Sequence, residues 1–394
     1  MKFLRTTVAV AALAALFGAP AYAARAYIGT YTPDLVNPNA YANGKGEGIY
    51  MVNVDDATGA LSGLKLVAKD RSPSWLALSA DHKFLYATNE IEAYGSDKSG
   101  SVTAYAIDTK SGALRKLNTV DSGGAGPAYI SIHASGKFAL IANYIGGSFS
   151  ILPIKPDGSL GEASDVVKPG GPMNSASAVD APPGQAPSQA NRGSHGHMIA
   201  SDPSGQYVVG DDAGRDNIFV WRLNTTTGKL MQVSVTKALA GSAPRHFGFS
   251  SDGKTLYQVG EYNDRLTTYG FADGKLTPKG KSISALPDGY QGTGTASRML
   301  VSPNGKNVYS ANRSENSIAT FAIGADGMAT KLANTPTEAE HPRSLTVDPG
   351  NKFLYSLNLR ANNITAFRIQ SDGVPRFTGK FLAVNAPAVM VFLP

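Results

Sequence analysis

The sequence predicts an all-β fold, a seven-bladed β-propeller whose blades are four-stranded antiparallel sheets. Three observations lead to this prediction: a repeat of roughly 50 residues, alternation of apolar and polar residues within each repeat, and two partial repeats at the chain ends that complement each other. No stretch after residue 23 shows the sustained periodicity of an amphipathic helix. A radial array of small sheets accounts for all three observations.

Each full repeat opens with two short apolar runs separated by a turn rich in Gly, Asp or Asn. The six copies are SPSWLALSADHKFLYATNE (72–90), GPAYISIHASGKFALIANY (126–144), SHGHMIASDPSGQYVVGDD (194–212), APRHFGFSSDGKTLYQVGE (243–261), ASRMLVSPNGKNVYSANR (296–313) and HPRSLTVDPGNKFLYSLNL (341–359). Period-2 alternation with many β-branched and aromatic residues predicts two antiparallel strands in each copy, strand A and strand B.

A third alternating run and then a fourth follow in the repeats. The third runs include SVTAYAI (101–107), NIFVWRL (217–223), SIATFAI (317–323) and NITAFRI (363–369), and the fourth runs include GALRKLNTV (112–120). These runs predict strands C and D, which complete a four-stranded blade.

The chain ends supply a seventh blade. The C-terminal run APAVMVFL (386–393) matches strand A, whereas the N-terminal runs match strands B, C and D. Those N-terminal runs are AYIGTYT (26–32), GIYMVNV (48–54) and LSGLKLV (61–67). A blade built from both ends closes the ring and leaves no open sheet edge. The sequence therefore predicts one propeller domain over residues 24–394.

The first 23 residues read as a secretory signal peptide. Lys2 and Arg5 precede a short apolar run, and small residues flank a cleavage site after Ala23. We therefore expect a periplasmic or secreted protein that is not inserted in a membrane once the signal is removed. The mature chain keeps 34 basic and 30 acidic side chains, a net charge of +4.

Composition excludes several classes of function. The basic residues are scattered singly, which predicts no nucleic-acid partner. The absence of cysteine excludes disulfides, thiolate catalysis and Cys-ligated zinc. We expect a monomer.

The long loops are predicted to rise from one face of the ring. The longest, residues 169–193, is an insertion between strand D of one blade and strand A of the next. Two others, 32–48 and 90–100, join strands B and C. In an antiparallel blade these two kinds of connection lie at the same end, so this face is the presumed active face.

Comparing equivalent positions of the repeats on that face reveals two unusual columns. The second residues of strands A are Ser74, Ala128, His197, Arg245, Ser297, Arg343 and Ala388. The residues at or just after the ends of strands B are Glu90, Tyr144, Ala213, Glu261, Arg313 and Leu359. The charged members come from neighbouring blades and should converge on one pocket. Arginines bind carboxylates or a developing oxyanion, and Glu and His move protons.

Further substrate contacts are expected next to these columns. The candidates are His195, Asp212, His246, Arg298, Arg343 and Asn358. His195 and His197 lie two residues apart on a strand and could share a metal ion, but no third ligand accompanies them, and we predict no metal site. An alternative for the whole set is a polar channel lining in which Arg and Glu of adjacent blades simply pair.

The sequence resembles the seven-bladed propeller lactonase family over nearly the whole mature chain. The resemblance is carried by YIGTYT (27–32), the H-x-H segment at 195–197, the PRH segment at 244–246 and SANR (310–313). It implies His197, Arg245, Glu261 and Arg313 as catalytic residues, acting on a small anionic lactone or its open-chain acid without a cofactor. Arg298 departs from the family pattern, in which an acidic or small residue is frequent.

The resemblance implies a lactonase or a lactonizing cycloisomerase, acting by general acid/base chemistry with Arg stabilisation of anionic groups. The predicted export argues against a dedicated enzyme for cytoplasmic phosphogluconolactone and favours a sugar or aromatic-derived lactone. The alternative class is a non-catalytic propeller that binds protein or glycan through its long-loop face.

Overall fold

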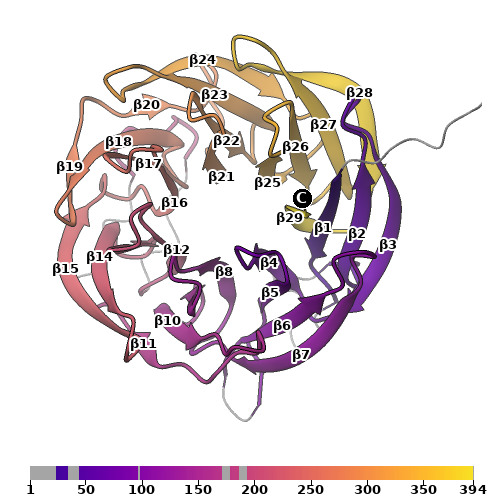
Figure 1. Ribbon diagram of the computed structural model, residues 1–394. Coiled ribbons are helices and arrows are strands. Elements are labelled where there is room, and N and C mark those ends of the chain that lie inside the picture. The colour runs from indigo at the N-terminus through magenta and orange to yellow at the C-terminus, as the bar shows by residue number, and fades with distance from the viewer. Residues whose placement is uncertain (1–23, 34–43, 96–97, 171–177, 186–192, 394) are drawn as a thin grey trace, which may run out of the picture.

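The computed structural model describes residues 24–33, 44–95, 98–170, 178–185 and 193–393, which form seven sheets around a central channel (Figure 1). The predicted signal peptide, residues 1–23, lies outside this described part. Each sheet is antiparallel, with strand A nearest the channel and strand D outermost. The predicted fold class is therefore confirmed.

The closing blade contains β29 (Pro387–Leu393), β1 (Ala24–Thr30), β2 (Gly48–Val54) and β3 (Leu61–Lys69). Blade 2 contains β4 (Pro73–Leu78), β5 (Phe84–Asn89), β6 (Ser101–Ile107) and β7 (Leu114–Asp121). Blade 3 contains β8 (Pro127–Ile132), β9 (Phe138–Asn143), β10 (Ser148–Pro153) and β11 (Asp165–Val167). Blade 4 contains β12 (Gly196–Ser201), β13 (Val208–Asp212), β14 (Asn217–Asn224) and β15 (Lys229–Lys237).

Blade 5 contains β16 (Pro244–Phe249), β17 (Thr255–Gly260), β18 (Arg265–Ala272), β19 (Lys275–Pro278) and β20 (Ile283–Ser284). Blade 6 contains β21 (Ala296–Val301), β22 (Asn307–Asn312), β23 (Ser317–Ile323) and β24 (Ala329–Pro336). Blade 7 contains β25 (Pro342–Val347), β26 (Phe353–Asn358), β27 (Asn363–Ile369) and β28 (Pro375–Ala383).

Blade 5 departs from the predicted four strands because its outer strand is split. The pieces β19 and β20 both pair with β18. β19 ends at Pro278, which has no N–H to donate to the ladder, and Gly280, in the gap before β20, has a positive φ of 66°. The break thus follows from local backbone chemistry and leaves the ring unchanged.

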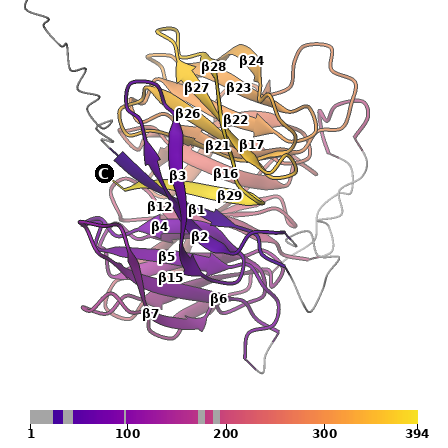
Figure 2. The same cartoon turned by 90° about the vertical axis from the view of Figure 1, so that its right-hand side faces the viewer.

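Strands from the two chain ends close the ring. The yellow β29 runs antiparallel beside the indigo β1, with Tyr27 opposite Val391 and Arg25 opposite Leu393 (Figure 2). Buried residues of β29, among them Ala388 and Met390, pack into the clusters that join the closing blade to its neighbours.

Neighbouring blades are joined by a recurring tyrosine contact. Tyr257 Oη donates to the carbonyl of Gly327, and Tyr309 Oη donates to that of Gly373, at 2.8 and 2.7 Å. Tyr355 reaches Gly59 and Tyr27 reaches Gly112 in the same way, at 3.0 and 2.9 Å. Each tyrosine is buried in the A or B region of its blade and each glycine lies in a C–D turn of the next, so these bonds fix blade spacing.

Candidate functional site

Strand A of each complete blade carries a β-bulge at its second or third residue. In blade 4 the pairing passes from Gly196 directly to Met198, so His197 has no partner across the ladder. The same shift leaves Arg245 unpaired in β16 and Arg343 unpaired in β25. A bulge re-aims the side chain of its extra residue. The column recognised in the sequence is therefore a ring of bulge residues directed at the channel.

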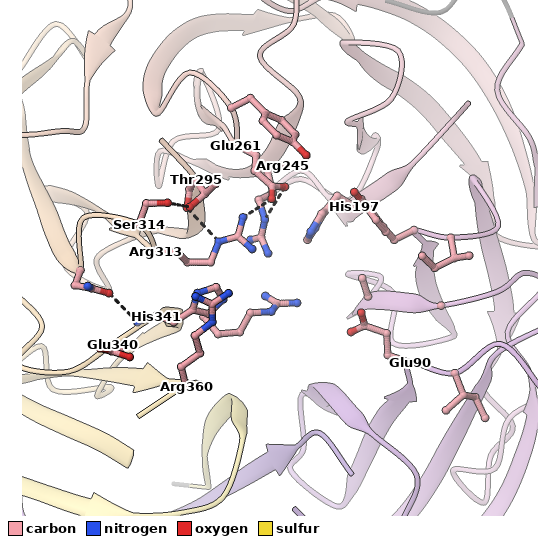
Figure 3. Close-up of a pocket in the computed structure, with 18 of the residues that line it drawn as sticks. Glu90, His197, Arg245, Glu261, Thr295, Arg313, Ser314, Glu340, His341 and Arg360 are labelled. Atoms are coloured by element: carbon pink, nitrogen blue, oxygen red, sulfur yellow. Dashed lines mark hydrogen bonds and ion pairs between the residues drawn. The ribbon is translucent and has the colours of Figure 1, made fainter. Parts of the chain in front are cut away.

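These bulge residues line a pocket of about 880 Å³ on the face where strands A begin and strands B end (Figure 3). The pocket lies within the size range of sites for small molecules. His197, Arg245, Glu261, Arg313 and Arg343 all line it. The predicted convergence of these five side chains is thus observed.

Glu261 lies between two guanidinium groups. Its Oε2 lies 3.2 Å from Arg245 Nε, and its Oε1 accepts a hydrogen bond from Arg313 Nη2. Burial raises the pKa of Glu261, but the charges of Arg313 and Arg245 outweigh burial and hold this pKa below its ordinary value. The carboxylate is therefore ionised at neutral pH and orients both arginines.

Arg313 is fixed from its other side by backbone oxygens. Its Nε donates to the carbonyl of Thr295 at 3.1 Å, and its Nη2 donates to that of Ala296 at 3.3 Å. Arg245 is only 2% exposed. Two arginines held in this way form a preorganised donor pair for an oxyanion, because little reorganisation is needed when negative charge develops.

His197 lies beside this cluster and is buried. Burial, followed by the charges of Arg245 and Arg343, holds its pKa well below the ordinary value of 6.5. Its ring contacts the rings of Tyr144 and His246, each at a centroid distance of 5.3 Å. The imidazole is therefore neutral at pH 7, a form that can accept a proton.

A second polar cluster contributes to the opposite wall. Arg343 donates to Tyr31 Oη from Nε and Nη2, at 3.3 and 3.2 Å, and Tyr31 Oη donates to Glu90 Oε2 at 3.0 Å. Figure 3 shows Glu90 across the pocket from Arg313 and His341. Because Tyr31 follows β1, ring closure brings part of this wall into place.

Loop residues complete the rim. His341 has a positive φ of 61°, and its backbone N–H donates to Asn316 Oδ1 at 2.7 Å. Burial, and then the charges of Arg313 and Arg360, lower the pKa of His341 to about 3. Among the described residues, the charged ones that line the pocket are four arginines (Arg245, Arg313, Arg343 and Arg360) and four glutamates (Glu90, Glu92, Glu261 and Glu340).

The same loop contact recurs around the face. Asp216, Asn316 and Asn362 occupy the left-handed last position of their B–C turns, with φ of 47°, 60° and 53°. Asp216 accepts from the N–H of Ala243 at 2.8 Å, and Asn362 accepts from that of Ala386 at 2.9 Å. Asp and Asn tolerate this backbone region and bind nearby N–H groups. These contacts hold the D–A loops that shape the rim.

Five of the six predicted contact residues lie outside the lining of this pocket, and only Arg343 is part of it. Asp212 accepts from the N–H groups of His195, Gly214 and Arg215, and so fixes its own loop. His195 Nδ1 lies 2.8 Å from the carbonyl oxygen of Tyr144, and its ring packs on the Tyr144 ring. These side chains organise the backbone around the H-x-H segment.

Asn358, His246 and Arg298 are also placed elsewhere. Asn358 binds Asn363 and Thr365 inside blade 7, each at 3.0 Å. His246 is 0% exposed in a ring cluster deeper in the channel, and Arg298 stacks on that cluster. Neither reaches the rim.

The pocket residues that sequence reasoning left out include Glu90, His341 and Arg360. It also left out Tyr31, which contacts the pocket residues Glu90 and Arg343. Glu90 was visible in the same column as Glu261 and Arg313, and its charge was the signal that could have identified it. Tyr31 acts through the seam between the chain ends. His341 and Arg360 lie in a D–A loop and a B–C loop, outside the two columns compared between repeats.

The described part of the predicted 169–193 insertion lies beside two D–A loops. Val179 N–H donates to the carbonyl of Ala240 at 2.8 Å, and Gly294 N–H donates to Gln185 Oε1 at 2.7 Å. Within the residues the structure describes, no group of three His, Cys, Asp or Glu is arranged to hold a metal ion. No helix in that part of the chain is long and apolar enough to span a membrane.

Comparisons with known proteins agree with this architecture. The family described as "Lactonase, 7-bladed beta-propeller" matches residues 25–392. The 6-phosphogluconolactonase of Bacillus subtilis is 29% identical over 80% of this chain and 83% of its own length. That of Formosa agariphila is 29% identical over 77% and 82%. The structure of a periplasmic gluconolactonase from Pseudomonas aeruginosa has a TM-score of 0.83 and 26% identity, covering 94% of this chain and 99% of that one.

Proposed function

The chain belongs to the seven-bladed β-propeller lactonase family, and from this premise we propose that it hydrolyses a neutral, polyhydroxylated sugar lactone to its open-chain acid. The observation that carries the proposal is the Arg245–Glu261–Arg313 cluster beside the neutral imidazole of His197. Such a group supplies oxyanion donors and a proton acceptor in one pocket.

The charge balance of the pocket favours a lactone without a phosphate group. In the part of the lining that the structure describes, four arginines are matched by four glutamates, and Glu261 engages two of those arginines. A phosphate dianion binds best where cations are in excess. Carboxylate, hydroxyl and amide groups, including those of Glu340, Ser314 and Asn316, instead suit the hydroxyls of a sugar. One negative charge develops on the carbonyl oxygen during the reaction, and the product acid carries one negative charge after it releases its proton to solvent.

The proposed reaction begins with attack of a water oxygen on the lactone carbonyl carbon. His197 takes the proton released by the water, and the carbonyl oxygen becomes an oxyanion held by Arg245 and Arg313. The bond from this carbon to the ring oxygen then breaks, and the ring oxygen takes the proton from His197. Water is consumed, one carboxylic acid and one alcohol form, and the imidazole returns to neutral.

The depressed pKa of His197 fits this role. Burial and the charges of Arg245 and Arg343 disfavour its protonated form in the empty pocket. A negative charge developing next to those arginines offsets their effect. The imidazole therefore becomes a stronger base as the oxyanion forms, which lowers the barrier to proton transfer.

Export remains a prediction and is part of this proposal. A periplasmic or secreted protein would meet unphosphorylated lactones, and the Pseudomonas relative described as a periplasmic gluconolactonase supports this placement. The relatives described as 6-phosphogluconolactonases support the competing phosphorylated substrate.

A substrate panel tests the proposal. The chain from Ala24 onwards is assayed by acid release with glucono-1,5-lactone, its 6-phosphate and a muconolactone, with the spontaneous rate subtracted. We expect kcat/KM for the neutral sugar lactone to exceed that for the phosphate by about tenfold or more. Faster turnover of the phosphate would overturn the substrate assignment. No turnover of any lactone would favour the alternative of a propeller that binds protein or glycan without catalysis.

A further inference from the structure

A second pocket, of about 390 Å³, lies at the other end of the central channel. It is lined by the later residues of β4, β8, β25 and β29, and by Arg298 of β21. Because strands A run away from the lactone pocket, these residues open towards the opposite face. The volume lies at the lower end of the range of roughly 300–1,000 Å³ for small-molecule sites. We propose that this pocket binds a small monocarboxylate with an apolar body, with Arg298 as its counter-ion.

Arg298 has a neutral hydrogen-bond partner, the hydroxyl group of Tyr129, but no carboxylate partner among the residues that the structure describes. Its guanidinium lies over the Trp75 ring, 4.5 Å from the centroid, and its Nε and Nη1 have no hydrogen-bond acceptor among the described residues. None of the other described residues that line this pocket is charged. A cation that is largely removed from water and lacks a counter-ion is unfavourable, so the site favours a ligand that brings one negative charge.

The residues that line the pocket indicate the chemical character of the rest of the ligand. Apolar residues line the pocket around Arg298, and the partly exposed ones among them include Ile132, Val347, Val391 and Phe392. Only Ser131, Ser344, Thr346 and Tyr129 add hydroxyl groups. A polyhydroxylated acid would lose hydration against these walls without enough partners, whereas a short alkyl chain would be stabilised by burial. One cation also matches a carboxylate better than a doubly charged phosphate.

A layer of packed rings separates the two pockets. Trp75 lies 4.5 Å from Tyr129 and 5.3 Å from His246, and His246 lies 5.3 Å from His197, as ring centroids. Trp75, Tyr129 and Arg298 face the second pocket, whereas His197 faces the first. The proposed site is therefore distinct from the lactone pocket and does not depend on lactone turnover.

Tryptophan fluorescence provides a direct test in the intact protein. The chain contains two tryptophans, and Trp75 lines this pocket while Trp221 is buried in blade 4. Titration with hexanoate should change the emission of Trp75 in a saturable manner. The uncharged analogue hexanamide and chloride should each bind at least about tenfold more weakly, because one lacks the charge and the other the apolar body.

Three variants locate the bound hexanoate. Arg298→Met should raise its Kd about tenfold or more, as expected for loss of a partly buried charge pair, and Arg298→Lys should restore part of the affinity. Arg376→Met removes an exposed arginine from β28 and should leave Kd within about twofold. Isothermal titration with wild type and Arg298→Lys covers the case in which Arg298→Met does not fold. Absence of saturable binding, equal affinity for hexanamide, or loss of binding in Arg245→Met with retention in Arg298→Met would each overturn the proposal.

Discussion

At the scale of single residues, the pocket is built from side chains whose charge is set by their neighbours. Glu261 stays ionised because Arg313 and Arg245 offset its burial, and His197 stays neutral because burial and arginines disfavour the cation. Proton acceptor and oxyanion donors therefore coexist in one pocket at neutral pH. The protonation state of each side chain depends on neighbouring residues that can be replaced one at a time.

The neutral state of His197 predicts the pH profile of the proposed lactonase activity. Since kcat/KM reports groups of the free enzyme and the pKa of His197 lies well below 6.5, kcat/KM should not fall as pH is lowered from about 7.5 to 6. The measurement is kcat/KM for glucono-1,5-lactone across this range, corrected for spontaneous opening. An acid limb with a midpoint at 6.5 or above would contradict the assignment of His197.

The Arg343–Tyr31–Glu90 contacts predict a binding role for Tyr31. Tyr31→Phe keeps the ring but removes the hydroxyl that accepts from Arg343 and donates to Glu90. We expect KM to rise about five- to tenfold with kcat changed less than threefold, because one positioned polar contact is worth about 1 kcal/mol. Tyr50→Phe on β2 removes an exposed hydroxyl contact and serves as the control. A Tyr31→Phe enzyme with wild-type KM would rule out this role.

At the scale of elements, the bulges and the B–C turns position the site. A bulge in each complete strand A projects its second residue into the channel, and the left-handed Asp or Asn of the B–C turns holds the neighbouring loop. Asp216 performs this task with an ionisable group, whereas Asn316 and Asn362 perform it with an amide.

Asp216 should make stability depend on pH. Burial raises its pKa from 3.8 to about 6, although the N–H groups of Ala243 and Gly241 act against this rise. A folded-state pKa above the unfolded value means that this contribution to stability is present below about pH 3.8 and is lost as pH rises through about 6.

Asp216→Asn should remove that dependence. The free energy of unfolding of the variant, relative to wild type, should increase by up to about 3 kcal/mol between pH 4 and 7, as the shift of about two pKa units implies. Denaturant titrations at several pH values measure this difference. A constant difference across the range would show that the Asp216 carboxyl titrates normally.

At the scale of the whole molecule, ring closure and site assembly are linked. β29 pairs with β1 across the chain ends, and Tyr31, which follows β1, contacts Arg343 of blade 7. Loss of the closing strand would expose the edge of β1 and separate the residues of the seam.

Deletion of residues 387–394 should therefore abolish cooperative folding. The deletion removes the β29 ladder and the buried side chains of Ala388, Val389 and Met390. We expect aggregation, or a broad transition in thermal unfolding followed by circular dichroism. A chain that lacks residues 1–23 is the control and should unfold in one sharp transition. A truncated protein with the same sharp transition would contradict the proposed role of closure.

The repeat made the fold and the central part of the pocket predictable from sequence. Equivalent positions could be compared between blades, and the repeated bulge gives the second residue of strand A the same direction each time, as for His197 and Arg245. Three kinds of contact were not accessible in this way. The contact of Tyr31 with Arg343 forms only when the ring closes. The side chain of Asn358 is hydrogen-bonded to neighbours inside its own blade. Arg298 belongs to the β-bulge of β21 and lies deeper in the channel, at the second pocket. The repeat pattern identifies equivalent positions in the blades. Local hydrogen bonds and the depth of each side chain in the channel then decide which of these residues can contact a ligand.

The central claim, that lactone hydrolysis occurs at the Arg245–Glu261–Arg313 cluster, is tested most directly by Glu261→Gln. The amide keeps the shape of the side chain but removes the charge that orients both guanidinium groups. We predict that kcat/KM for glucono-1,5-lactone falls about hundredfold or more, as for loss of a preorganised oxyanion site, while Glu162→Gln, at an exposed glutamate outside the pocket, changes it by less than about threefold. An active wild-type enzyme whose Glu261→Gln variant retains full kcat/KM would contradict the account.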